Sequence, residues 1–304
     1  MRYELDLHEP LGATVIGVVT SQVDQALEGL ATIEGGTSPE RSTEVVHDAR
    51  KRAKKVRAVA RAVRDAVGDE GYHAVNDAAR DGARELSDVR DAQVLGETVD
   101  ELLGWAKEHE SIDVDRRRHQ VARVEVQRRA EQATARPDLA TAAGRAGDLL
   151  RLARASAEGW TVPDDLDALA DGLDRTYRRG RAGWKAARRA RTVEALHEWR
   201  KRVKYGWYHL RLLGPVAPEV LGDEARRFHQ LADVLGDDHD LAVLACTVSA
   251  DPEAWGGTQR AGELADLAGV RRRELQAAAF HLGSQLFVRK PAARLDHLER
   301  LWAS

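Results

Sequence analysis

Helical periodicity extends over most of the chain and limits the fold more than any other feature. Ala, Leu, Arg, Glu and Asp recur at steps of three and four residues, whereas strand-like alternation over four or more residues is almost absent. Glycine and proline fall at the breaks between these stretches, where they favour turns. We therefore predict an all-α fold, with helices over about 12–33, 39–67, 71–109, 115–133, 137–157, 164–191, 192–213, 218–248, 258–286 and 292–302.

An internal repeat divides the chain into two halves. The nine residues from Val46 to Lys54 align with those from Leu196 to Lys204 at an offset of 150, sharing the pattern His-acidic-x-Arg-Lys-Arg-x-Lys. Farther along, residues 86–91 (LSDVRD) align with 235–240 (LGDDHD) at an offset of 149. Two matches at nearly one offset predict two copies of one helical unit, residues 1 to about 158 and about 159 to 304, packed as a single domain.

Each repeated helix carries a cationic stripe beside its apolar face. On a helical wheel the stripe lies about 120° round from the apolar face. In the first copy it consists of His47, Arg50, Lys54, Arg57 and Arg61, and in the second of His197, Arg200, Lys204 and Arg211. No acidic residue within the stripe relieves the repulsion between like charges, so we expect an external anion to do so. Two such helices packed through their apolar faces would turn both stripes toward one shared groove.

A third predicted helix, 164–191, adds Arg178, Lys185 and Arg189 on one stripe, whereas its counterpart in the first half has no cations there. We therefore expect the second half to contribute more of the charge in the groove.

Composition sets the remaining bounds. No apolar run approaches the length of a membrane span, no secretory signal is evident, and the single cysteine cannot form an internal disulfide. We expect a cytoplasmic protein that does not associate with membranes, with Cys246 buried in the apolar run 241–248. The formal net charge of −3 does not by itself indicate an anionic partner.

These motifs resemble those of the CHAD family (conserved histidine α-helical domain). The resemblance rests on the basic helix that opens with histidine and on the downstream Leu-Gly-x-x-Arg-Asp-like element, both present twice. It implies two four-helix repeats with pseudo-twofold symmetry around a basic groove that binds inorganic polyphosphate, in the cytoplasm and in association with polyphosphate granules. The phosphate contacts that it implies are Arg50, Lys51, Lys54, Arg57, Arg200, Lys201 and Lys204. Three positions depart from the pattern or from the repeat: Ser87 replaces a glycine, His239 replaces an arginine, and Trp207 stands where the first copy has Arg57.

Two other classes of function fit parts of the sequence. His47-Asp48 and His239-Asp240 are typical of metal-dependent phosphohydrolases, but the repeat aligns them with His197-Glu198 and Arg90-Asp91, so they are unrelated positions. A nucleic-acid-binding protein could also use a basic groove, although the basic segments hold only one aromatic cluster for stacking bases: Tyr205, Trp207 and Tyr208. We therefore expect binding of polyphosphate, or of another polyanion, without catalysis, metal or cofactor.

Two roles remain open for His47 and His197. Each imidazole could contact phosphate as a cation, or stay neutral and hydrogen-bond to an aspartate such as Asp91 or Asp240, holding helices together. The sequence favours the structural role.

Overall fold

The computed structural model describes residues 3–109, 116–135 and 138–303, and within these ranges all regular secondary structure is helical. The predicted all-α fold is therefore confirmed. The helices are α1 Leu11–Glu34, α2 Pro39–Ala62, α3 Arg64–Glu85, α4 Ser87–Glu108, α5 Arg116–Thr134, α6 Leu139–Glu158, α7 Asp167–Ala190, α8 Val193–Leu212, α9 Pro218–Ala250, α10 Thr258–Leu286 and α11 Pro291–Trp302. Two short 3₁₀ turns, Gly214–Val216 and Pro252–Trp255, flank α9.

The largest departure from the predicted helices lies in the first half. The predicted helix 71–109 is divided between α3 and α4 at Leu86, which leaves helical geometry with φ −103° and ψ 14° and is buried. In the second half, the aligned segment stays inside α9 without a break. The bend at Leu86 directs α4 away from α3, so that α4 packs against α5 and α9.

Both basic helices begin at a hydroxyl N-cap. Ser38 Oγ accepts a hydrogen bond from the Arg41 backbone N–H (3.3 Å) before α2, and Thr192 Oγ1 accepts one from the Ala195 N–H (3.2 Å) before α8. Such caps satisfy amide donors that the first helical turn leaves without partners. The caps thereby fix where the cationic stripes begin.

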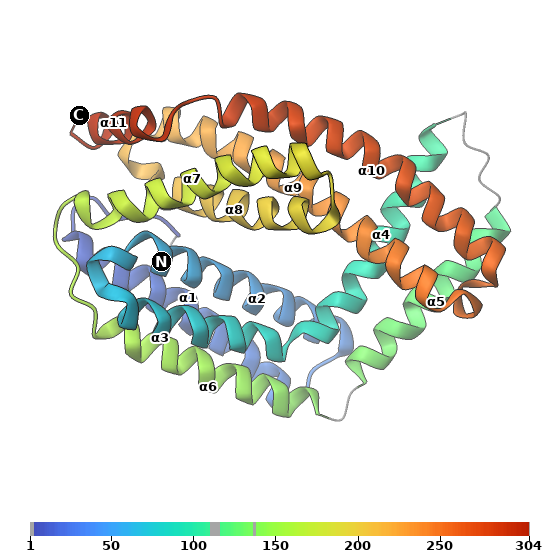
Figure 1. Cartoon of the computed structure of the whole chain (residues 1–304). Helices are drawn as coiled ribbons and strands as arrows, with labels where there is room; N and C mark the ends of the chain where they lie inside the picture. The colour runs from blue at the N-terminus through green and yellow to red at the C-terminus, as the bar shows by residue number, and fades with distance from the viewer. Residues whose placement is uncertain (1–2, 110–115, 136–137, 304) are drawn as a thin grey trace.

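The helices form two bundles that lie side by side, with a projecting end (Figure 1). Helices α1, α2, α3 and α6 make the lower bundle in that view, and α7, α8, α9 and α11 lie above it. One large apolar cluster includes residues from both bundles, among them Val18, Val59, Trp199 and Phe287. A second, smaller cluster joins α4, α5, the end of α9 and α10.

Direct contacts join the two halves at α2. Gly172 of α7 lies so close to the end of α2 that a Cβ atom there would be 2.1 Å from the Ala62 carbonyl oxygen. His209 of α8 is buried, and its Nε2 lies 2.9 Å from the Ala58 carbonyl oxygen of α2. Helices α7 and α8 are therefore both held to α2, the first by close backbone approach and the second by a side-chain hydrogen bond, in addition to the apolar core.

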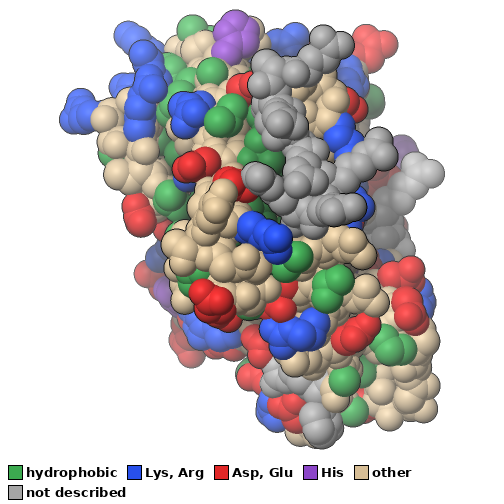
Figure 2. All heavy atoms as spheres, turned by 90° about the vertical axis from the view of Figure 1, so that its right-hand side faces the viewer, with side chains coloured by type: hydrophobic (Ala, Val, Ile, Leu, Met, Phe, Trp, Pro, Cys, Tyr) green, Lys and Arg blue, Asp and Glu red, His purple; other side chains and the backbone are tan. Residues whose placement is uncertain are grey.

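In the view onto the projecting end, Lys and Arg side chains lie interspersed with Asp and Glu among the described residues (Figure 2). Cys246, predicted to be buried, is exposed on α9, because α9 turns other residues of that run, such as Leu244 and Val248, toward the core. Over the described ranges, no helix is both long enough and apolar enough to cross a membrane.

Candidate anion-binding site

A cavity of about 650 Å³ lies between α2, α4, α8 and α9. Its charged and imidazole lining comes from both halves of the chain. Helices α2 and α4 contribute His47, Arg50, Lys51, Lys54, Arg57, Arg90 and Asp91, and helices α8 and α9 contribute His197, Arg200, Lys201, Lys204, His229, His239 and Asp240. Eight lysines and arginines thus face two aspartates, which makes this cavity strongly cationic.

Three of the four residue pairs that the repeat aligns lie in this lining. These are His47 with His197, Arg50 with Arg200, and Lys54 with Lys204. The fourth pair, Arg61 and Arg211, lies outside the lining. Arg61 stacks on the Tyr205 ring, with Cζ 4.3 Å from the centroid, and Arg211 lies over the rings of Tyr3 and Trp207.

The α7 cations do not border the cavity. Arg178 pairs with Asp174 on its own helix, and Lys185 and Arg189 are exposed. The expectation that the second half supplies more of the charge is therefore not met by the lining, in which residues 1–158 supply five lysines and arginines and residues 159–304 supply three. The structure adds a helix that the sequence did not assign to the groove: the bend at Leu86 lets α4 bring Arg90 to the cavity.

Two of the cavity lysines, Lys54 and Lys204, lie in an environment that disfavours their charge. Burial, followed by repulsion from Lys204, Arg50 and Arg200, lowers the pKa of Lys54 to about 7. Burial and Arg200 likewise lower the pKa of Lys204. Lys54 keeps water-accessible surface, but that surface borders the cavity between the helices. Its ammonium is therefore partly hydrated, and the charge costs less than it would in a dry interior.

Several cationic donors of the lining have no protein acceptor. The Nε atoms of Arg50 and Arg200 are buried without a hydrogen-bond partner. Among the described residues, Lys54, Lys204 and Arg200 form no ion pair with a carboxylate. Buried donors without acceptors are costly, so an anion entering this cavity would relieve both repulsion and unmet hydrogen bonding.

The two aspartates do not neutralise this field. Burial raises the pKa of both Asp91 and Asp240, although Arg50 near the first and Arg200 near the second act in the opposite direction. Neither carboxylate forms an ion pair with a cation within the described part of the chain. The lining therefore keeps a large positive excess.

Burial favours the neutral form of three cavity histidines, His47, His197 and His239. The rings of His197 and His239 lie 4.2 Å apart between centroids, and burial is the largest cause that lowers the pKa of each to about 4. Burial also lowers the pKa of His47. Across the described chain, neither His47 nor His197 hydrogen-bonds to Asp91 or Asp240, which corrects the bond suggested from sequence. The reason is that the His197 ring packs on His239 instead.

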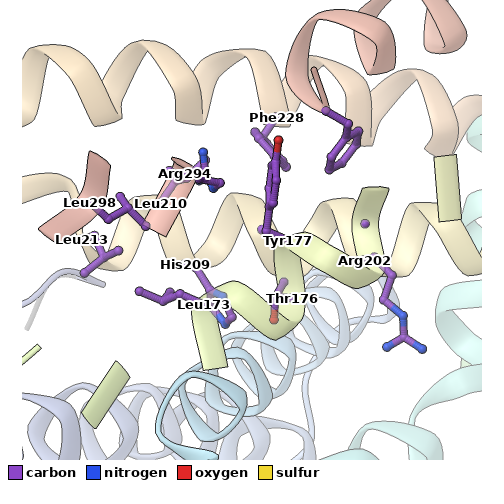
Figure 3. Close-up of a pocket in the computed structure, with 13 residues that line it drawn as sticks. Leu173, Thr176, Tyr177, Arg202, His209, Leu210, Leu213, Phe228, Arg294 and Leu298 are labelled. Atoms are coloured by element: carbon purple, nitrogen blue, oxygen red, sulfur yellow. The ribbon is translucent and has the colours of Figure 1, made fainter. Parts of the chain in front are cut away.

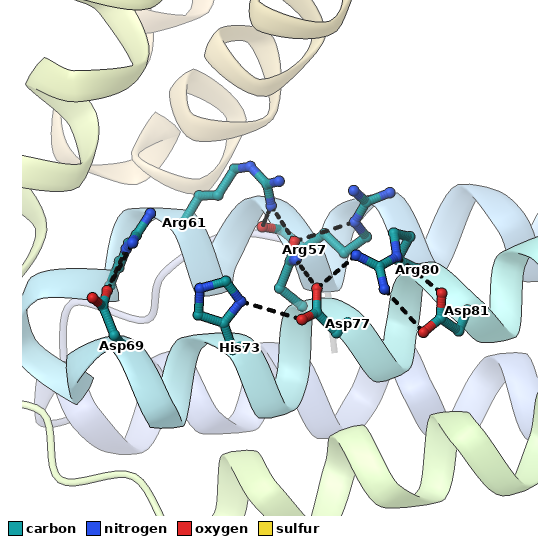
Figure 4. A network of polar contacts seen from close by, with 9 residues as sticks. Arg57, Arg61, Asp69, His73, Asp77, Arg80 and Asp81 are labelled. Carbon is teal, nitrogen blue, oxygen red and sulfur yellow. Dashed lines mark hydrogen bonds and ion pairs between the residues drawn. The ribbon is translucent and has the colours of Figure 1, made fainter.

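Two features of the site could not be found by the repeat. Asn76 of α3 is buried, and its Oδ1 accepts hydrogen bonds from Arg57 Nε (3.3 Å) and from Arg61 Nη1, so it orients both side chains. Asp77 and Arg80 extend this polar network along α3 (Figure 4).

The second feature is an aromatic wall formed by Trp207, Tyr208 and His229. The Trp207 ring stacks on Tyr208 (4.7 Å between centroids) and on His229 (4.2 Å). Trp207, which replaces a cation of the first copy, therefore fills space against the cavity.

The metal-site reading gains no support from the geometry. Within the described ranges, no three His, Cys, Asp or Glu side chains gather as a metal site would require.

Fold and site together define an all-helical protein whose two basic helices face an internal cationic cavity. Residues 21–249 match the family model of the CHAD domain, so the chain belongs to the CHAD family. The match includes all of α2 and α8, which carry most of the lining. No curated protein matches the sequence significantly.

Proposed function

We propose that the protein binds inorganic polyphosphate in the cavity between α2, α4, α8 and α9, and that it does so without catalysis. The observation that carries this proposal is the convergence of eight lysines and arginines from both halves on one cavity with two aspartates. Such a charge excess is unfavourable unless an anion occupies the space.

The spacing of the cations supports a linear anion with many charges. Arg50, Lys54 and Arg57 follow one another on α2 at intervals of three and four residues, about one helical turn or 5.4 Å along the axis. Arg200 and Lys204 repeat this spacing on α8. A chain of phosphates offers charge at every unit, so it can meet both rows at several points, with arginine as a forked donor and lysine as a compact charge.

A nucleic acid is the second candidate, and the aromatic wall disfavours it. Base stacking needs an accessible ring face. Trp207 is only 9% exposed, and it already stacks on Tyr208 and His229. Competition between long-chain polyphosphate and single-stranded DNA separates the candidates, because polyphosphate should displace DNA and DNA should not displace polyphosphate.

Polyphosphate as the ligand would place the protein in the cytoplasm at polyphosphate granules. A fluorescent fusion should colocalise with stained granules, and the cavity variant described next should not.

The test compares two charge reversals of equal size. K54E/K204E reverses two cavity lysines, whereas K185E/R189E reverses two exposed α7 cations outside the lining. Polyphosphate affinity should fall at least a hundredfold in the first variant and less than threefold in the second, with unchanged far-UV circular dichroism in both. Equal losses would mean that diffuse surface charge binds the ligand, and the proposal would then be wrong.

The dependence of polyphosphate affinity on salt concentration reports the number of ion contacts. Each neutralised phosphate of a single strand lowers the slope of log K against log salt by about 0.7, so eight contacts predict a slope near −6. The cavity variant should show a distinctly shallower slope.

A further inference from the structure

A second arginine cluster lies beside the cationic cavity, between α2, α3, α7 and α8. Its five arginines surround a small separate cavity together with Tyr72, Tyr205, Thr176 and Gly172, and among the described residues no carboxylate borders it. The arginines are Arg61, Arg64, Arg175, Arg179 and Arg202.

The tyrosines orient the arginines of this cluster. The Cζ atom of Arg61 lies 4.3 Å from the Tyr205 centroid, and that of Arg64 lies 4.6 Å from the Tyr72 centroid. Stacking occupies the faces of a guanidinium and leaves the N–H donors in its plane free to bond. Arg202 also lines an apolar pocket with Tyr177 and Phe228, but its guanidinium end points away from their rings (Figure 3).

Charge compensation within the cluster is incomplete. Arg64 pairs with Asp69 (2.7 Å) and Arg175 pairs with Asp65 (2.6 Å), but both carboxylates lie outside the lining. Arg202 lies 3.6 Å from Glu198, a carboxylate that also pairs with Lys201.

The other two arginines have no carboxylate partner in the described structure. Arg61 donates only to the neutral acceptors Asn76 Oδ1 and the Arg57 carbonyl oxygen. Arg179 is exposed and, within the described residues, donates to no protein acceptor; partial desolvation together with Arg202 and Arg175 lowers its pKa. The cluster therefore has donors and positive charge to offer an anion, and Arg179 gives access from solvent.

The size of the small cavity limits the ligand. Its volume is about 20 Å³, against about 650 Å³ for the larger cavity, and is a little above the roughly 10–15 Å³ that one water needs. The space can therefore take no more than one small group, and it excludes a run of linked phosphates.

We infer that the Arg61, Arg64, Arg175, Arg179 and Arg202 cluster is a second anion site, which holds a single phosphate group. That group could be free orthophosphate or the end of a polyphosphate chain whose remainder lies in the larger cavity. Tyr205 borders both cavities, and Asn76 accepts hydrogen bonds from Arg57 of one and Arg61 of the other, so the two sites adjoin. Only the chain-end alternative rests on the function proposed above.

The first experiment isolates the second site. Isothermal titration calorimetry with sodium phosphate is carried out on K54E/K204E, in which the larger cavity is disabled, and then with R179Q/R202Q added. The matched control adds R178Q/R189Q, two arginines of α7 outside the cluster. Orthophosphate binding should persist in K54E/K204E, weaken at least tenfold with R179Q/R202Q, and stay within twofold with the control.

Absence of orthophosphate binding in folded K54E/K204E, or equal weakening by both added pairs, would overturn the second site. Neither result would affect the larger cavity, which is tested with polyphosphate on the otherwise unaltered protein. If R179Q/R202Q loses helicity, R179Q alone decides the question, since Arg179 is exposed and holds nothing in place. If K54E/K204E loses helicity, K54Q/K204Q replaces it.

The second experiment identifies the source of the phosphate group. Long-chain polyphosphate is titrated into the otherwise unaltered protein and into R179Q/R202Q. If the site holds the chain end, the salt slope should become shallower by about 0.7, the value for one phosphate, and orthophosphate should compete with polyphosphate. If it holds free orthophosphate, the slope should be unchanged and both ligands should bind together. Either result supports the site, whereas orthophosphate that competes equally well in both proteins would contradict it.

Discussion

Acid should weaken the protein through His209, the buried histidine that joins the two basic helices. This residue is 3% exposed, and because a carbonyl oxygen can only accept, its Nε2–H donates to the Ala58 carbonyl oxygen. Burial lowers the pKa of His209 to about 4, opposed by this hydrogen bond and assisted by Arg61 and Arg294. At neutral pH the imidazole is therefore uncharged in the folded protein.

The pKa gives the magnitude and the sign. In the unfolded chain the pKa is near 6.5, and each pKa unit corresponds to about 1.4 kcal/mol, so the difference amounts to about 3 kcal/mol. Above pH 6.5 His209 is unprotonated in both the folded and the unfolded state, so its full contribution to the free energy of unfolding is present. As the pH falls from 6.5 to about 4, the unfolded state takes up the proton first, so the free energy of unfolding decreases. Below pH 4 the loss is complete.

The assay is urea unfolding followed by far-UV circular dichroism across this pH range. H209Q keeps an amide N–H that can donate to Ala58 but cannot titrate, so its free energy of unfolding should fall by about 3 kcal/mol less than that of the unaltered protein. H8Q, at an exposed histidine, is the control and should follow the unaltered protein. Other histidines, among them His197 and His239, titrate in all three proteins and cancel in the comparison. Identical pH dependence in H209Q and the unaltered protein would refute the reasoning.

Three further outcomes are expected. Because a bound polyanion favours the charged form of Lys54, whose pKa is lowered to about 7, polyphosphate affinity should rise as the pH falls from about 9 to 7, and K54R, which stays charged, should flatten this rise in a fluorescence titration. G172A places a Cβ 2.1 Å from the Ala62 carbonyl oxygen and should lower the free energy of unfolding by about 1–3 kcal/mol, whereas G104A, with open space around it, should not; equal denaturation midpoints would contradict this. Exposed Cys246 should react with a thiol reagent in the native state at a rate close to that of the denatured protein, and a protected thiol would show that it is covered.

Local sequence rules accounted for most of the fold. Helix spacing and breakers located the helices, and α10 has the predicted bounds. They failed at Leu86, since a bend without glycine or proline is set by which neighbours the two segments pack against. They failed also at Cys246, because one apolar run on a helix turns some residues inward and others outward.

The internal repeat predicted the central residues of the candidate site but not the residues at its borders. Matched identity and azimuth found His47, Arg50, Lys54 and their partners, because a helix fixes the direction of such side chains. The assignment of Arg178, Lys185 and Arg189 required knowledge of how α7 packs, which one helix cannot reveal. Arg90 belongs to the second repeated element, but its place beside the cavity depends on the placement of α4, and Asn76 of α3 is shown only by the tertiary structure. Polyphosphate binding and the twofold relation of the repeats remain predictions.

The larger cavity has a consequence for the cohesion of the molecule. In addition to burial, Lys204 of the second half lowers the pKa of Lys54 in the first, and Arg90 of the first half lowers the pKa of Lys204. The free protein therefore keeps its halves together against local electrostatic repulsion. An anion lodged there would touch both halves at once and turn that repulsion into attraction. The ligand would then hold the two halves together through ion pairs with both, and a larger force would be needed to separate them.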